Sequence, residues 1–382
     1  MTAEKTTLHQ LLDAGQSPWL DYITRDLLKS GKLQSLIDKG IVGMTSNPTI
    51  FQKAIADGAS DYDEDLQSLV RDNKDIPGIY DGLVLDDIRR AATILRPVYD
   101  KSNGHDGFVS IEVPPELSHN TERTLAEARR IFAQLNMPNI MVKIPGTAEG
   151  LPAIQHAIAE GININVTLLF SVDNYRQVAE AYITGLEQRA SAGQPIDKIA
   201  SVASFFVSRV DTAVDKKLDA LIDSATDEGR KEELRGLKGK AAIANAKMAY
   251  AAYQELFSGP RWDVLAAHAA AVQRCLWAST STKNPAYRDV MYVEGLIGPD
   301  TVDTMPPATI DQFMDHGTVA PTITQDVEVA RTELGALERA GISMDEVTRQ
   351  LQEDGVKLFT ESFNELIGTI SGKRDEMMSH AR

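Results

Sequence analysis

The stretch NIMVKIPG, residues 139–146, is an apolar run that contains one lysine and ends in a proline and a glycine. A short apolar run bounded by turn residues is typical of a strand buried on both faces, as in a parallel sheet. Lys143 would then carry its amine into the protein interior, where an ammonium is poorly solvated. The same kind of run recurs along the rest of the chain.

Short runs rich in apolar or β-branched residues alternate with longer helical patterns. We count eight of them: Pro18–Ile23, Ile41–Thr45, Phe108–Val113, Ile140–Ile144, Ile164–Phe170, Ile199–Phe206, Cys275–Ser279 and Thr301–Met305. Alternation of this kind predicts βα units and a parallel sheet. Eight such units predict an α/β fold of the (β/α)8 class, a TIM barrel, with additional helices.

The connecting segments have apolar residues three and four positions apart, as amphipathic helices do. Examples are Thr24–Lys39, Thr121–Leu135 and Asn174–Ser191. Two longer connections, residues 50–106 and 210–273, are predicted to hold several helices each. Helices are also predicted from about Thr309 onward, with a start signal at Ser343. Because no low-complexity or Pro-rich segment divides the chain, we expect a single domain over residues 1–382.

Composition excludes several classes of protein. The chain has 382 residues, 43% of them apolar and 25% charged, which is ordinary for a globular protein. A net charge of −16 argues against a nucleic-acid partner. The only cysteine, Cys275, lies in an apolar run and is expected to be a buried thiol without a disulfide. No apolar stretch is long enough for a signal peptide or a membrane span, so we expect a cytoplasmic protein with no membrane partner.

Polar side chains occur in or just after most of the predicted strands. In chain order they are Asp21, Asn47, Glu112, Lys143, Asn165, Thr167, Ser204 and Ser279. Barrel enzymes build their active sites from residues at the C-terminal ends of the strands. These positions are therefore candidates for a single site.

Lys143 and Glu112 have the most specific chemistry in this set. Removing an amine from water favours its neutral form, which is a nucleophile for carbonyl carbon. The alternative is a strand-end lysine whose amine reaches solvent. Glu112 on the adjacent strand is either the proton carrier of an amine reaction or a structural ion-pair partner. Asp21 is a third candidate, although it could instead cap the helix that follows it.

Metal and cofactor motifs are not found in the sequence. The seven histidines show no metal-ligand spacing such as HExxH. There is neither a GxGxxG fingerprint nor a P-loop, and GLKGK at residues 236–240 lacks the required spacing. We therefore expect no metal site and no cofactor.

Several stretches resemble one enzyme family. GMTSNPTIF at 43–51 is similar to the first transaldolase signature, and VKIPGTAEG at 142–150 is similar to the second, which contains a Schiff-base lysine. SIEV at 110–113, NINVTLLF at 163–170 and SFFVSR at 204–209 also resemble transaldolase segments. The resemblance extends from about Asp21 to beyond Met305.

The resemblance implies a transferase mechanism in the non-oxidative pentose phosphate pathway. Lys143 would attack the C2 carbonyl of fructose 6-phosphate or sedoheptulose 7-phosphate. Glu112, through a water positioned by Thr167, would move the protons of imine formation. Asp21 would remove the C4 hydroxyl proton, so that the C3–C4 bond breaks and erythrose 4-phosphate or glyceraldehyde 3-phosphate leaves.

The resemblance also implies the substrate-binding residues. Asn47 and Asn165 would hydrogen-bond the retained three-carbon dihydroxyacetone unit. Ser204 and Arg209 would bind the phosphate group, a role that suits the planar guanidinium fork.

The chain differs from shorter family members in three places. A helical insertion separates Asp21 from Asn47, as in a long form of the family. Where some members have a second phosphate-binding arginine, this chain has Lys283, with Arg288 further on, so Ser279 and Lys283 are candidate phosphate ligands. An appended sugar-phosphate isomerase domain, present in some longer members, does not fit within 382 residues.

Two alternative functions remain open at the level of sequence. One is a fructose 6-phosphate aldolase that releases free dihydroxyacetone, and the other is a non-catalytic barrel that binds sugar phosphates. The oligomeric state is not determined by any sequence feature, and a homo-oligomer is open.

Overall fold

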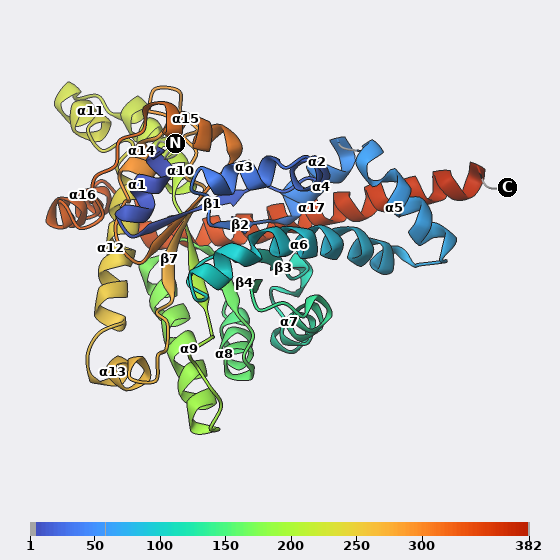
Figure 1. The fold of residues 1–382 in the computed structure, drawn as a ribbon. Coiled ribbons are helices and arrows are strands. Elements are labelled where there is room, and N and C mark those ends of the chain that lie inside the picture. The colour runs from blue at the N-terminus through green and yellow to red at the C-terminus, as the bar shows by residue number, and fades with distance from the viewer. Residues whose placement is uncertain (1–4, 58, 381–382) are drawn as a thin grey trace.

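The computed structural model describes residues 5–57 and 59–380 and contains a closed barrel of eight parallel strands in sequential order (Figure 1). The strands are β1 (Gln16–Asp21), β2 (Gly43–Thr45), β3 (Val109–Glu112), β4 (Ile140–Pro145), β5 (Ile164–Leu169), β6 (Ser201–Phe206), β7 (Arg274–Ala278) and β8 (Thr301–Met305). β1 pairs with both β2 and β8, which closes the barrel. The predicted (β/α)8 fold is confirmed, and each predicted run overlaps one strand.

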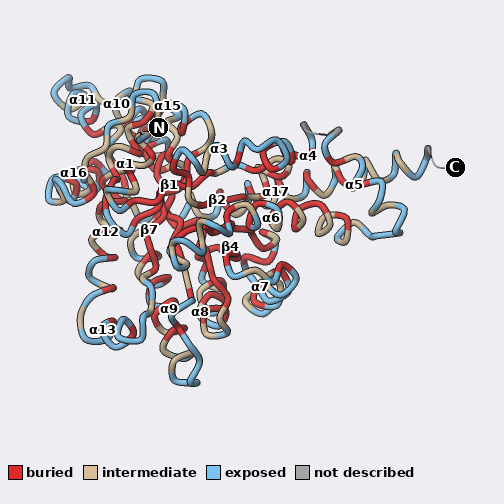
Figure 2. Tube along the Cα trace, viewed as in Figure 1, coloured by how far each residue is buried: buried red, intermediate tan, exposed pale blue. Residues whose placement is uncertain are grey.

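The strands are apolar because both of their faces are covered. Every residue of β4, β5 and β6 is buried, as expected where helices pack outside and side chains fill the barrel. Cys275 on β7 is a buried free thiol, as predicted, and its burial raises the pKa of this thiol to about 12. Figure 2 shows the buried segments concentrated in the barrel.

Helices surround the barrel and extend beyond it. In chain order they are α1 (Thr7–Asp13), α2 (Arg25–Lys29), α3 (Lys32–Asp38), α4 (Pro48–Asp57), α5 (Ala59–Arg71), α6 (Ile76–Lys101), the 3₁₀ turn η1 (Pro115–Leu117), α7 (Thr121–Leu135), α8 (Gly150–Glu160), α9 (Val172–Ser191), α10 (Ser208–Ser224), α11 (Glu228–Arg235), α12 (Ala241–Leu256), α13 (Pro260–Ala266), α14 (Met291–Glu294), α15 (Pro307–His316), α16 (Val327–Arg339) and α17 (Met344–His380). Among the described residues, none of these helices has both the length and the apolar character needed to cross a membrane.

The helix predicted at Thr24–Lys39 is two helices, α2 and α3. Thr24 caps α2 by accepting a hydrogen bond from the Leu27 amide at 3.2 Å. Gly31 then adopts a left-handed φ of 82°, which ends the first helix and starts the second. The helical insertion between Asp21 and Asn47 therefore consists of two short helices rather than one.

The other helix predictions are closer to the structure. α7 begins and ends at the predicted residues, and Asn120 caps it by accepting from the Arg123 amide at 3.0 Å. The connection 50–106 holds α4, α5 and α6, and the connection 210–273 holds α10 to α13. Ser343 accepts a hydrogen bond from the Glu346 amide at 3.3 Å and precedes α17, as its start signal predicts.

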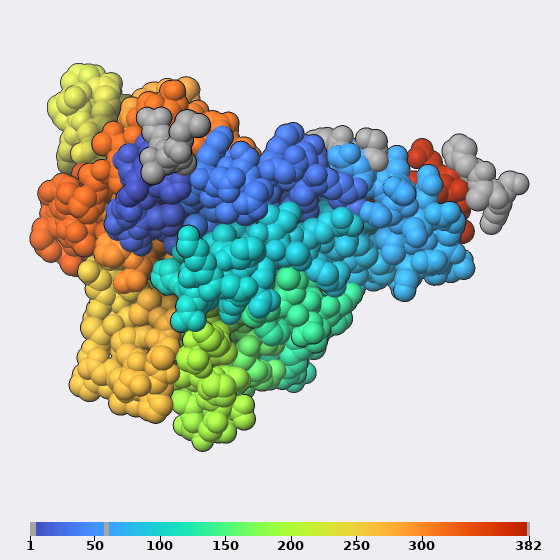
Figure 3. Space-filling model, viewed as in Figure 1, coloured from blue at the N-terminus to red at the C-terminus, as the bar shows by residue number. Residues whose placement is uncertain are grey.

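The 37-residue helix α17 lies across the barrel and continues beside α5 and α6 (Figure 1). In the space-filling view only its far end, beside α5, is visible (Figure 3). It contacts α4, α5, α6, α10 and β5. Tyr80 on α6 packs edge-on against Phe363 on α17, with ring centroids 5.4 Å apart. Leu366 and Ile370 belong to the same core cluster as the barrel strands, so α17 is continuous with the barrel core.

A buried arginine joins α2 to the helices that follow β2. Arg25 is fully buried and ion-pairs with Asp87 on α6 and Asp65 on α5. Tyr62 on α5 donates a hydrogen bond to Asp87 at 2.7 Å. Because a buried charge must be paired, this network determines where α5 and α6 sit relative to β1.

A second buried network closes the N-terminal end of the barrel. Arg274 at the start of β7 donates to Asp106 at 3.1 Å and to Ser17 of β1 at 2.8 Å. Ser17 and Trp19 in turn donate to the Asp106 carboxylate at 2.8 and 3.2 Å. The side chains of Arg274 and Asp106 are only 5% and 7% exposed, so this pair is desolvated.

We predict that Arg274→Met lowers the free energy of unfolding by about 3–5 kcal/mol, because Asp106 would remain buried without its cation. Denaturant unfolding followed by circular dichroism measures the effect. Arg129→Met is the matched control, since Arg129 pairs with Glu160 at the surface, and it should leave the midpoint unchanged. Equal midpoints for the two variants would contradict the prediction.

Candidate active site

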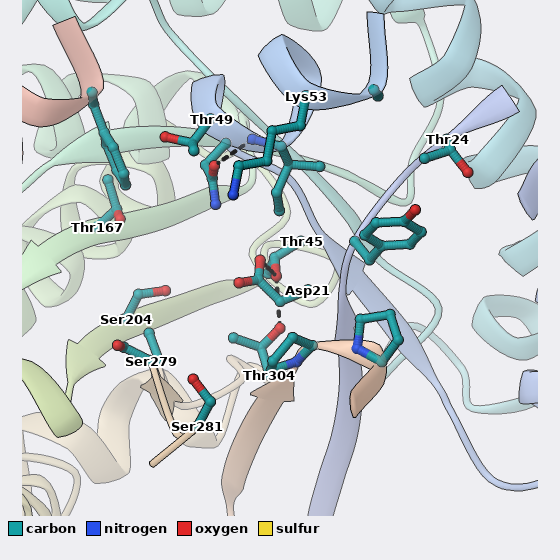
Figure 4. A pocket seen from close by; sticks show the side chains of 18 of the residues that line it. Asp21, Thr24, Thr45, Thr49, Lys53, Thr167, Ser204, Ser279, Ser281 and Thr304 are labelled. Carbon is teal, nitrogen blue, oxygen red and sulfur yellow. Dashed lines mark hydrogen bonds between the residues drawn. The ribbon is translucent and has the colours of Figure 1, made fainter. Parts of the chain in front are cut away.

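A cavity of about 900 Å³ opens at the C-terminal ends of the barrel strands (Figure 4). Its walls include side chains from or next to seven strands: Asp21, Thr45, Asn47, Lys143, Thr167, Ser204, Phe206, Ala278, Ser279 and Thr304. Helices and loops add Lys53 and Ile50 of α4, Arg209 of α10, Phe359 of α17, Ser281 and Lys283. The structure thus brings most of the predicted site residues to one place.

Lys143 lies in this cavity beside Glu112. The register of the barrel sets Glu112 of β3 opposite Lys143 of β4, and Lys143 opposite Asn165 of β5. The Lys143 Nζ is 3.3 Å from Glu112 Oε2 and donates to the Ser46 carbonyl at 3.0 Å. With side chains 6% and 2% exposed, the two groups form a buried ion pair, which excludes the alternative of a lysine extending to solvent.

Burial raises the pKa of Glu112, although the charge of Lys143 opposes the shift. Neither oxygen of this carboxyl makes a hydrogen bond within the described part of the chain, so Lys143 is its charge partner. A buried carboxyl with a raised pKa exchanges a proton more readily near neutral pH. Glu112 is therefore suited to accept or donate a proton next to the amine.

Asp21 is a second acid in the same cavity, and its side chain is half-buried. Desolvation raises its pKa, and Lys143 and the hydrogen bond from Thr45 oppose the shift. Thr45 donates to Asp21 at 2.7 Å and its hydroxyl is 2.6 Å from that of Thr304. Figure 4 shows these three side chains grouped together on the cavity wall. Thr24, not Asp21, caps the following helix, so the alternative role for Asp21 is not realised.

Asn165 lies behind the cavity wall. Its side chain is fully buried, donates to Ser110 at 3.0 Å and accepts from Ser204 at 2.7 Å. Ser204 itself lines the cavity. Thr167, two residues further along β5, also lines the cavity, and its buried hydroxyl has no hydrogen-bond partner among the described residues.

Asn47 both lines the cavity and forms a hydrogen bond at the start of α4. Its Oδ1 accepts a hydrogen bond from the Ile50 amide at 3.0 Å, at the start of α4. The bond orients the Asn47 side chain, and the Nδ2 group carries the donors that a ligand would need.

The opposite side of the cavity is cationic. Arg209 stacks between two aromatic rings, 5.2 Å from the Phe206 centroid and 6.0 Å from the Phe359 centroid. Burial lowers the pKa of Lys283, and the charges of Arg209 and Lys53 lower it further. The Lys283 amine donates to Ser281 at 2.7 Å. Two neighbouring positive charges thus act on Lys283, and a cluster of cations of this kind is suited to bind an anion.

Sequence reasoning missed Lys53. It lies one turn after Thr49 and Ile50 on α4, so all three share the helix face that borders the cavity. Figure 4 shows its side chain extending from α4 into the cavity. The spacing of four and three residues from Thr49 and Ile50 to Lys53 is the sequence signal that could have identified Lys53 as a cavity residue. Arg288, by contrast, pairs with Glu294 at 2.7 Å and is not part of the cavity lining.

A buried acid anchors the loop that carries the β7 side of the site. Ser279 has a left-handed φ of 58° and its hydroxyl is 2.9 Å from that of Ser208. Thr280 follows and donates to Asp303 on β8 at 2.8 Å. Asp303 is fully buried, and its burial raises its pKa to about 7. Within the described residues, no group of three His, Cys, Asp or Glu side chains is arranged to hold a metal ion.

The parallel barrel, with a lysine–carboxylate pair in the cavity at the C-terminal ends of its strands, defines the class of (β/α)8 barrel enzymes. The chain belongs to the transaldolase/fructose-6-phosphate aldolase family, whose model matches residues 18–370. The transaldolase of Trichodesmium erythraeum is 49% identical over 369 residues, covering 96% of this chain and 97% of that one.

Two further relatives have similar sequence identity to this chain. The transaldolase of Thermobifida fusca is 49% identical, over 95% of this chain and 97% of its own. Transaldolase 1 of Streptomyces coelicolor is 47% identical, over 98% of this chain and 96% of its own. The family resemblance found in the signature motifs is thus confirmed over nearly the whole length.

We predict that Asp303→Asn removes a pH dependence of stability. The pKa of Asp303 is about 7 in the folded protein, against an ordinary value of 3.8, so the folded state binds this proton more tightly than the unfolded chain. The contribution to stability is therefore full below the ordinary pKa and is lost as the pH rises to about 7. Between about pH 5 and about pH 8 the wild type should lose about 2–3 kcal/mol that the variant does not lose.

Denaturant unfolding of both proteins at these two pH values measures the difference. The prediction fails if the stability difference between wild type and variant is the same at both.

Proposed function

We propose that the protein is a transaldolase, which transfers a dihydroxyacetone unit from sedoheptulose 7-phosphate or fructose 6-phosphate to glyceraldehyde 3-phosphate or erythrose 4-phosphate. The activity is that of a transferase, as in the named relatives. The observation that carries the mechanism is the buried Lys143–Glu112 pair, 3.3 Å apart, in a cavity whose other side is cationic.

The reaction begins at Lys143. Proton transfer to Glu112 leaves a neutral amine, which adds to the C2 carbonyl of the ketose to form a carbinolamine. Glu112 then protonates the C2 hydroxyl, water leaves and an iminium forms. The raised pKa of the Glu112 carboxyl supports its use in both directions. The unpartnered hydroxyl of Thr167 is suited to hold the water that carries these protons.

Asp21 acts in the bond-breaking step. Its carboxylate removes the C4 hydroxyl proton, the C3–C4 bond breaks, and the electron pair moves into the iminium to give an enamine on Lys143. The aldose phosphate formed from C4 onward leaves. Desolvation makes Asp21 a stronger base than an exposed aspartate, and the Thr45 hydrogen bond orients it. Reversal with another aldose phosphate completes the transfer.

The remaining residues bind substrate. Arg209 and Lys283 pair with the phosphate, with Ser204 and Ser279 as hydroxyl donors. We add Lys53 as a third cation, because its charge already acts on Lys283.

The three-carbon unit is held on the opposite side. Asn47 contacts it directly from the cavity wall. Asn165 lies one layer deeper, where it accepts a hydrogen bond from Ser204 at 2.7 Å and donates one to Ser110 at 3.0 Å. The second N–H of its amide is the donor that we assign to the three-carbon unit.

A fructose 6-phosphate aldolase is the second candidate, because the matching family includes both activities. The two enzymes share the Schiff base and differ in whether the enamine waits for an acceptor aldehyde. Sustained turnover of fructose 6-phosphate should therefore require erythrose 4-phosphate or another acceptor. Release of free dihydroxyacetone without acceptor would favour the aldolase.

Three broader assignments belong to the same proposal. The chain acts as one domain over residues 1–382, which the continuous core from barrel to α17 supports. It works in the non-oxidative pentose phosphate pathway in the cytoplasm, on sugar-phosphate substrates, without a resident cofactor or metal. A homo-oligomer is compatible with the proposal but is not required by it.

We predict that borohydride reduction in the presence of fructose 6-phosphate attaches a three-carbon or six-carbon unit to Lys143. Only an imine is reduced to a stable secondary amine, so peptide mass mapping locates the nucleophile. Lys143→Ala should give no adduct, and Glu112→Gln should form it about 100-fold more slowly. A label on another residue, or none, would overturn the mechanism.

We predict that Lys53→Met raises the KM for fructose 6-phosphate by about 10-fold with little change in kcat, because it removes one cation from the phosphate side. Steady-state kinetics measures both constants. Lys357→Met on the exposed surface of α17 is the matched control and should behave as wild type. An unchanged KM for the Lys53 variant would remove Lys53 from the phosphate site.

A further inference from the structure

β5 is distorted immediately after Thr167. Leu168 has a left-handed φ of 60°, a conformation that is rare for a branched side chain. The pairing register between β5 and β6 also shifts between Val166 and Leu169, so that β5 holds one extra residue. This is a β-bulge, a feature that re-aims a side chain at a barrel rim. Thr167, whose side chain lines the cavity, directly precedes Leu168, so its exact position depends on how this bulge is held.

A strained backbone persists only where its surroundings hold it. A hydrogen bond from α17, far away in the sequence, restrains Leu168. Gln352 donates through Nε2 to the Leu168 carbonyl at 3.0 Å and to Asn174 Oδ1 at 2.9 Å. The same nitrogen is 3.3 Å from the Gly146 carbonyl, which also accepts from Asn174 at 2.8 Å.

The segments joined in this way flank the catalytic residues. Gly146 follows the strand of Lys143, and its amide donates to the Thr167 carbonyl at 2.9 Å. Asn174 lies in the first turn of α9, directly after β5. One side-chain amide of α17 therefore ties together the ends of β4 and β5.

The helix also approaches Leu168 closely. A Cβ at Gly355 would lie 2.8 Å from Leu168 Cδ2, so any larger residue there would displace the Leu168 side chain. Gln352, Gly355 and Phe359 are three and four residues apart and share one helix face. That face contacts β5 at one end and Arg209, through Phe359, at the other.

We propose that Gln352 is a positioning residue for imine formation: by holding the strained Leu168 carbonyl it keeps the Thr167 hydroxyl directed into the cavity beside Lys143. The proposal rests on the proposed function and extends it to a helix outside the barrel. Gln352 does not contact substrate. It acts through Leu168 and Thr167.

The test compares Gln352→Leu with Gln350→Leu. Gln350 lies on the same helix, but its amide donates to Asp354 at the surface, so the control has the same chemical change without the contact to β5. Gln352→Leu should slow borohydride-trapped imine formation by about 10- to 100-fold, since small misplacement of a catalytic group has effects of this size. Its KM should change less than about 3-fold, and the control should match wild type.

A double-mutant cycle separates positioning from a general loss of stability. If Gln352 acts through Thr167, then Gln352→Leu should have little further effect on the imine rate in a Thr167→Val background. Fully additive effects would overturn the proposal. Gly355→Ala provides a second perturbation of Leu168 with Gln352 intact and should slow the same step.

Hydrogen exchange gives a readout that does not depend on turnover. Amides at residues 167–174 should exchange faster in Gln352→Leu than in Gln350→Leu. Equal exchange in the two variants would show that Gln352 does not hold the end of β5, and would overturn the proposal. An adduct in wild type with equal imine rates in the two variants overturns this proposal alone. Absence of any adduct in wild type overturns the proposed function, and the catalytic part of this proposal with it.

Discussion

The pairing of Glu112, Lys143 and Asn165 across β3, β4 and β5 is the constraint on which the site depends. In a parallel barrel a shift of one residue would turn each of these side chains to the other face of the sheet. A charged amine in the barrel interior is tolerated because a carboxylate lies 3.3 Å away and a carbonyl accepts its hydrogen bond. The same desolvation that makes the pair necessary also raises the pKa of Glu112, which makes it useful for proton transfer.

The cavity has two electrostatic halves. Asp21 and Glu112 are acids whose pKa values burial raises, while Arg209, Lys283 and Lys53 stand opposite them. The net charge of −16 is therefore compatible with binding a phosphorylated sugar, because the local field in a cleft is set by the few groups that face it. Under the proposed function, a ketose phosphate would place its carbonyl at Lys143 and its phosphate at the cations.

Helices outside the barrel complete the site. Phe359 of α17 covers one side of Arg209, and Ser362 of the same helix is 2.8 Å from the Thr49 hydroxyl on α4. α4 in turn carries Lys53. The Arg25 network holds α5 and α6 against α2, so that Tyr62 of α5 reaches the cavity wall. Helices α4 and α17 thus lie beside the cationic groups of the cavity, whereas the strands carry Lys143, Glu112 and Asp21.

Local patterns in the sequence predicted the eight strands, most helices and the candidates Asp21, Glu112, Lys143, Thr167 and Ser204, because periodicity and strand-end polarity depend on neighbouring residues. Arg209 was a candidate only through the family resemblance. The sequence did not reveal that Thr24–Lys39 breaks into two helices, since one glycine with a left-handed φ decides it. Only the tertiary structure could bring Lys53 and Phe359 to Arg209, or Gln352 to Leu168. Those contacts join residues far apart in the chain, and no local pattern records which distant side chain will restrain a strained backbone. The strand sequences therefore indicate which groups carry the chemistry of the site. How those groups are aligned depends on how α4 and α17 pack over the strands.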